Sequence, residues 1–146
     1  MSGDAVPLDE LEIAYRRVSR ALYRAQEDAL DFSAEEIIAA LDRDQTIVDA
    51  AFFVLIFGQV ESRINGLAAS RLTRPEQRSA IREAKFERRL AKALPGAGWR
   101  RVREELEDWY KTRNRAAHGE EVVAGGYNIS GIFERARELD ALLSDP

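Results

Sequence analysis

The sequence contains no cysteine and only one histidine, His118, among its 146 residues. Disulfides and thiolate metal sites are therefore excluded, and a zinc site would need carboxylates, for which no spacing is suggestive. We expect no metal ion and no cofactor. The lack of cysteine suits a reducing compartment, and residues 1–7 carry neither the basic nor the apolar region of a secretion signal. We therefore expect a cytoplasmic protein.

Long apolar runs are also missing. The longest, residues 50–57, has eight residues, whereas a helix that spans a bilayer needs roughly 20. A membrane is therefore not expected as a partner. A glycine-rich phosphate loop after a strand is absent as well, which argues against common nucleotide-cofactor folds. The length fits a single domain covering residues 1–146.

Apolar residues in the first half recur at steps of three and four, the period of amphipathic helices. Residues 8–29 form one such pattern, and residues 33–36 have the form of a capping box that opens a short second helix. Asp42 or Asp44 is a candidate cap for a third helix that runs to about Leu72. Because its middle is apolar on all sides, we expect this helix at the centre of a bundle or in a subunit interface.

The second half continues the helical pattern. Residues 73–76 form another capping box, which opens a fourth helix that ends near residues 95–98. A fifth helix is predicted from about Trp99 to Gly119, followed by a loop or short hairpin with its turn at Gly125–Gly126 and a last helix over 130–143. The sequence thus predicts an all-α fold, an up-and-down bundle of four to five main helices.

The net charge of −4 is unevenly distributed. Residues 1–49 carry 12 acidic and 5 basic side chains, whereas residues 71–103 carry 11 basic and 3 acidic ones. The basic segment suits RNA or a partner protein, although such runs are usually solvated faces bridged to nearby acids, here Glu83, Glu87 and the acidic half. Only Phe86 lies nearby as an aromatic, so base stacking is not supported on this helix. The predicted continuous basic face of the fourth helix consists of Arg74, Arg78, Arg82, Lys85, Arg89 and Lys92.

The side chains best suited to catalysis lie together at the end of the fifth predicted helix. His118 is the only histidine, so we expect any general acid–base chemistry near neutral pH to depend on it. Arg113 continues an apolar helix face, where a guanidinium needs a partner or a cleft, and Glu61 is the acid that we expect to pair with it or to orient it. Asn114 precedes His118 by four residues, so its amide could orient the imidazole. The plainer alternative is a histidine that only contacts carbonyls at a helix end.

The segment Arg-Asn-Arg-Ala-Ala-His-Gly at 113–119 resembles the Arg-Asn-x-x-x-His motif of the HEPN superfamily (higher eukaryotes and prokaryotes nucleotide-binding domains). The resemblance implies a helical, dimeric, metal-independent endoribonuclease of toxin–antitoxin or other defence systems, with an antitoxin or another regulatory protein as a partner. One departure is Glu120, where toxins silenced by a nucleotidyltransferase often carry tyrosine. That mode of silencing is therefore in doubt for this chain.

RNA cleavage without a metal uses the 2′-hydroxyl as nucleophile and leaves a 2′,3′-cyclic phosphate and a 5′-hydroxyl. His118 would transfer a proton, Arg113 would stabilise the phosphorane, and Asn114 would orient. Each chain supplies one histidine, and positions five apart diverge by about 140° around a helix. Both points favour a site shared by two protomers of a symmetric homodimer. The alternatives are a non-catalytic HEPN-like module that binds nucleic acid or a partner protein, and a helical interaction protein in which Arg113 is a paired core ion.

Overall fold

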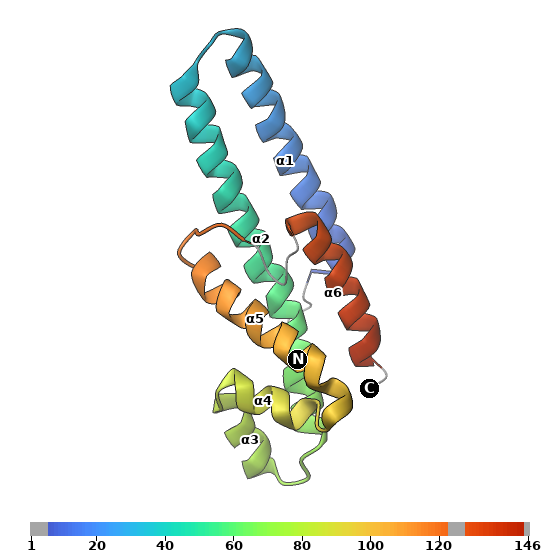
Figure 1. Cartoon of the computed structure of the whole chain (residues 1–146). Helices are drawn as coiled ribbons and strands as arrows, with labels where there is room; N and C mark the ends of the chain where they lie inside the picture. The colour runs from blue at the N-terminus through green and yellow to red at the C-terminus, as the bar shows by residue number, and fades with distance from the viewer. Residues whose placement is uncertain (1–5, 123–127, 145–146) are drawn as a thin grey trace.

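The computed structural model describes residues 6–122 and 128–144 of the chain. Over these residues it is all-helical and contains no strand (Figure 1), which confirms the predicted fold class. A 3₁₀ turn, Ala97–Trp99, precedes α5. The helices are α1 (Leu8–Asp31), α2 (Glu35–Ser70), α3 (Pro75–Glu83), α4 (Phe86–Ala93), α5 (Arg100–Ala116) and α6 (Ile129–Ser144).

The arrangement is built on a long antiparallel hairpin of α1 and α2. The other helices gather around the C-terminal half of α2: α5 and α6 pack along it, and α3 and α4 lie at its far end (Figure 1). The opposite end of the hairpin therefore extends beyond the body of the bundle. None of the described helices combines the length and the apolar character that crossing a membrane requires.

The N-terminal half of α2 differs from the sequence prediction. The expected short second helix and the third helix that would begin at Asp42 or Asp44 are one continuous helix, and both aspartates are exposed within it. The expected capping box is also wrong, because the N-cap is Ala34, without a side-chain hydrogen bond, and Ser33 has φ 52°. A break at Asp42 would remove backbone hydrogen bonds of α2. The packing of α2 against α1 favours the continuous helix, because tertiary packing supplies most of the stability of a helix.

The predicted fourth helix is two helices. Residues Ala84 and Lys85 are extended, with ψ of 158° and 149°, so α3 ends and α4 begins with a change of direction. This corner lets Ile81 and Phe86 both be buried, with 8% and 2% of their surface exposed. The helix start at Pro75 was predicted correctly, but the capping box was not, because Arg74 is the N-cap and makes no side-chain capping bond.

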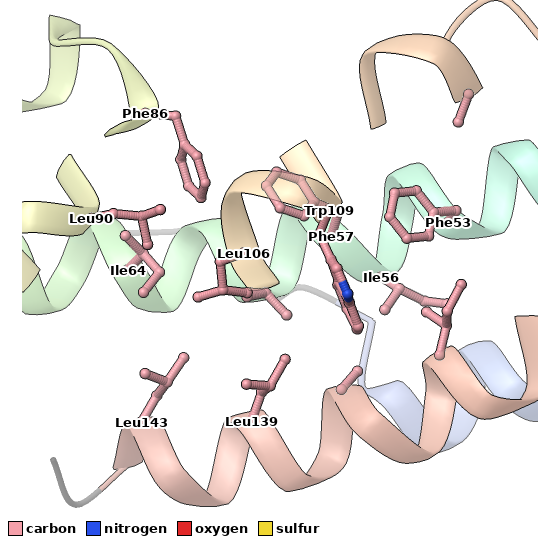
Figure 2. Close-up of a cluster of buried hydrophobic side chains, with 14 of the residues drawn as sticks. Phe53, Ile56, Phe57, Ile64, Phe86, Leu90, Leu106, Trp109, Leu139 and Leu143 are labelled. Atoms are coloured by element: carbon pink, nitrogen blue, oxygen red, sulfur yellow. The ribbon is translucent and has the colours of Figure 1, made fainter. Parts of the chain in front are cut away.

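The core lies where α2, α4, α5 and α6 meet. In Figure 2, Phe53 and Phe57 of α2 lie beside Trp109 of α5, and the ring centroids of Phe53 and Trp109 are 5.8 Å apart. Leu106 of α5 and Leu139 of α6 are also fully buried. Because α5 contributes some of the largest buried side chains, its position on α2 is well determined by packing.

Candidate functional site

The Arg113–His118 segment lies at the C-terminal end of α5. The last turn closes as a Schellman motif: Gly119 N–H donates to Ala116 O at 2.9 Å, and Glu120 N–H donates to Arg115 O at 3.4 Å. Gly119 has φ +74°, the left-handed conformation that glycine adopts without penalty. Gly119 therefore terminates the helix as predicted: α5 ends at Ala116, and His118 lies in the closing turn.

The three predicted catalytic side chains reach the surface at this end. His118 and Asn114 are exposed, and Arg113 is half-buried rather than part of the apolar core. Arg113 Nη1 donates to Asn114 Oδ1 at 3.3 Å. Among the described residues, no hydrogen bond joins Asn114 to His118, so the amide holds the guanidinium and not the imidazole.

Glu61 does not pair with Arg113. Its Oε2 accepts a hydrogen bond from Arg89 Nη1 at 3.0 Å, and the same Arg89 nitrogen donates to Asn65 Oδ1 at 2.7 Å. Arg89 Nε also donates to the backbone oxygen of Ala84. Glu61 therefore pairs with Arg89 of α4, an arginine that the sequence placed on the solvent face, and not with Arg113.

The predicted continuous basic face is also wrong. The corner at Ala84–Lys85 divides it between two helices, and Arg89 turns inward against α2. Arg78 Nε donates to Leu72 O at 2.8 Å, although its side chain stays exposed. The exposed cations that remain at α3 and α4 are divided between two helices. They are Arg74, Arg78, Arg82, Lys85, Arg88 and Lys92.

Two further arginines of the basic segment hold the backbone together. Arg71 Nε donates to Ala93 O at 3.0 Å, and Arg103 Nη1 donates to the oxygens of Leu94 and Gly96 at 2.6 and 2.7 Å. Residues 93–96, which join α4 to α5, are thus tied to α2 and α5. Part of the basic charge therefore serves the fold, since the last carbonyls of a helix need donors.

The structure adds a cleft that the sequence did not reveal. It lies between the start of α4 and the middle of α5, has a volume of about 570 Å³, and includes Asn114 in its wall. Tyr110 also lines it, stacked on Phe86 with ring centroids 4.8 Å apart. The signal in the sequence was that Tyr110 and Asn114 lie four residues apart on one helix face. Phe86 was found beside the basic residues, but only the fold brings it to Tyr110.

Two further sequence predictions concern the segment before α6 and the absence of a metal site. The expected turn at Gly125–Gly126 falls outside the described residues. Across residues 6–122 and 128–144, no group of three or more histidine, aspartate or glutamate side chains is placed to hold a metal ion. Comparisons of the chain with protein-family models, with curated proteins and with solved structures find no match.

Proposed function

We propose that this protein is a metal-independent endoribonuclease of the HEPN type. The observation that carries the proposal is the placement of the Arg-Asn-x-x-x-His segment. His118 and Asn114 are exposed and Arg113 is half-buried at one end of α5, directly before the glycine that terminates the helix. In the proposed role the chain acts as a toxin or defence effector, controlled by an antitoxin or another regulatory protein.

The roles follow from the chemistry of the three side chains. The planar guanidinium of Arg113 matches the oxygens of a phosphate and stabilises the charge that develops on them. Its hydrogen bond to Asn114 leaves other N–H donors of the guanidinium for a phosphate. The exposed imidazole of His118 transfers a proton to or from the RNA. The products are a 2′,3′-cyclic phosphate and a 5′-hydroxyl.

A second protomer completes the proposed site, because the reaction needs two proton transfers and each chain has one histidine. The C-terminal end of α5 adjoins an apolar surface of α2: a Cβ at Gly119 would lie 4.0 Å from Ile47 Cγ1. Ile47 and Leu55 are 57% and 51% exposed, and Ala51 between them is exposed as well. This surface supports a symmetric homodimer that brings two motif segments together.

The test is cleavage of RNA by the purified protein in excess chelator. We expect cleavage by the wild type and its loss, by 100-fold or more, in His118→Ala and Arg113→Ala, each still folded by circular dichroism. Arg101→Ala is the matched control, since Arg101 is exposed on the same helix and distant from the motif. Equal cleavage by His118→Ala and the wild type would contradict the assignment.

The second candidate is a non-catalytic module that binds nucleic acid. It is favoured by the exposed cations that remain on α3 and α4, such as Arg82, Arg88 and Lys92. This candidate predicts RNA binding that weakens steeply with salt, because cations on the protein displace counterions, and no cut products at any protein concentration.

A further inference from the structure

The cleft between α4 and α5 opens beside the proposed catalytic segment. Its α5 wall carries Glu107, Tyr110, Lys111 and Asn114, and its other wall carries Lys85, Phe86 and Glu87 from the start of α4. Tyr110 precedes Arg113 by three residues, which is about 4.5 Å along a helix axis. A group held in the cleft is therefore next to Asn114, whose oxygen accepts from Arg113.

The lining of the cleft includes a stacked aromatic pair. Tyr110 stacks on Phe86 with an interplanar angle of 20°, and Phe57 lies 6.1 Å from Tyr110. Arg89 covers Phe86, with its guanidinium carbon 5.3 Å from the ring centroid, and is itself held by Glu61. Phe86 is buried, whereas Tyr110 is partly exposed. Tyr110 is therefore the ring that a ligand in the cleft would contact.

The polar groups of the cleft are of mixed character. The lining includes two lysines, Lys85 and Lys111, and two glutamates, Glu87 and Glu107, so the lining residues carry no net charge. Such a lining does not favour a simple anion. It suits a ligand with a phosphate, which lysine binds, and with N–H donors, which carboxylates accept. Asn114 adds amide N–H donors, because its oxygen already accepts from Arg113.

We infer that this cleft binds one nucleotide of the RNA strand, with its base against Tyr110 and its phosphate near Lys85 and Lys111. This inference rests on the proposed function for the identity of the strand. Base stacking tolerates any sequence, whereas the two carboxylates favour bases that present N–H donors. The cleft therefore positions the strand beside Arg113 and Asn114 and gives cleavage a preference for the base at this position.

The first experiment measures binding separately from cleavage. Short 2′-O-methyl oligonucleotides lack the nucleophilic hydroxyl, so their affinity for the full chain can be measured by fluorescence anisotropy. We expect Tyr110→Ala to weaken binding about tenfold or more, because one stacking contact is lost. Tyr110→Phe keeps the stack and should bind within about twofold of the wild type. Tyr23→Ala, which removes an exposed tyrosine from α1, is the matched control.

A second pair of variants covers the case in which Tyr110→Ala does not fold. Lys111→Glu reverses an exposed charge in the cleft, and Arg101→Glu reverses an exposed charge on the same helix outside it. We expect Lys111→Glu alone to weaken binding tenfold or more. Equal losses in both variants would overturn the inference, as would a folded Tyr110→Ala protein with unchanged affinity or a wild type that binds none of the oligonucleotides.

The inference and the proposed nuclease activity can fail independently. If the wild type binds oligonucleotides through Tyr110 but cuts no RNA, the cleft is confirmed and the nuclease is not. If the wild type cuts RNA in a His118-dependent way, while Tyr110→Ala leaves KM and the base preference unchanged, the nuclease is confirmed and the cleft is not. A positioning role for Tyr110 predicts a raised KM and an altered preference between bases, which a purely structural role would not produce.

Discussion

Arg89 shows how the surroundings of one side chain decide its role. It contacts Glu61, Asn65 and the backbone of Ala84, and only 12% of its side chain is exposed. We expect Arg89→Ala to lower the free energy of unfolding by about 1–3 kcal/mol, because it leaves a half-buried carboxylate and a carbonyl without a donor. Denaturation by urea, monitored by circular dichroism, measures the loss.

The control for Arg89→Ala is its neighbour. Arg88 is exposed, and within the described part of the chain its side chain makes no ion pair. Arg88→Ala should therefore change stability by no more than about 0.5 kcal/mol. Equal changes in the free energy of unfolding for the two variants would contradict the buried, paired role of Arg89.

Tyr15 makes stability depend on pH at the alkaline end. Its hydroxyl donates to Asp49 Oδ1 at 2.7 Å, and burial together with this hydrogen bond raises the pKa of Tyr15 from 10.0 to about 12. Because the folded-state pKa is the higher one, the contribution of Tyr15 is complete below about pH 10 and is lost as the pH rises toward 12. The stability of the wild type should fall across this window more than that of Tyr15→Phe. Parallel stability curves from urea denaturation would contradict the contact.

At the scale of elements, two backbone positions behave opposite to their sequence signals. Asp44 lies inside α2, whereas Lys85 is an N-cap with φ −57° and follows the extended Ala84. A proline at position 44 would remove a helical hydrogen bond, so we expect Asp44→Pro to cost about 3 kcal/mol or more. Lys85→Pro should cost less than about 1 kcal/mol, since proline already prefers this conformation.

Chemical denaturation of both proline variants, with helix content from circular dichroism, measures these costs. A tolerated proline at position 44 would indicate the helix break that the sequence suggested. A severe effect at position 85 would indicate that α3 and α4 are one helix in solution.

The packing of α5 is the feature of the whole molecule on which the proposed site depends. Trp109 and Leu106 are fully buried against α2 and its neighbours, and Arg135 of α6 bonds Glu105 of α5 through two nitrogens at 2.7 and 2.8 Å. The C-terminal end of α5 is therefore presented at a defined place beside Ile47.

A composite dimer site that needs both copies of His118 has a direct consequence for mixtures of wild type and His118→Ala. After random exchange of equal amounts, only about a quarter of the dimers carry two intact histidines, so we expect roughly a quarter of the cleavage given by the same total concentration of wild type. Native mass spectrometry checks that the protomers exchange. Cleavage at about half of the wild-type level, as expected if each protomer acts alone, would argue against a shared site.

Local signals predicted several elements well. The apolar period identified α1 and α6 nearly to their ends, and Gly119 marked the end of α5 through its backbone conformation. The same signals failed in two places. Asp42 and Asp44 have capping preferences but lie inside a continuous helix, whereas Ala84 and Lys85 lie in a predicted helix but form a corner. Preferences at such positions are worth about 1 kcal/mol, which tertiary packing readily exceeds.

The sequence by itself determined that the chain is helical, that the Arg113–His118 segment lies at the C-terminal end of a helix, and which residue types are present for chemistry, because these depend on period, capping and composition. Only the tertiary structure decided which charges face which partners. Arg89 pairs with Glu61, Arg113 donates a hydrogen bond to Asn114, and Phe86 stacks on Tyr110 in a cleft. The Arg89–Glu61 and Phe86–Tyr110 pairings join residues from different helices, and their geometry depends on how the helices pack rather than on any local pattern.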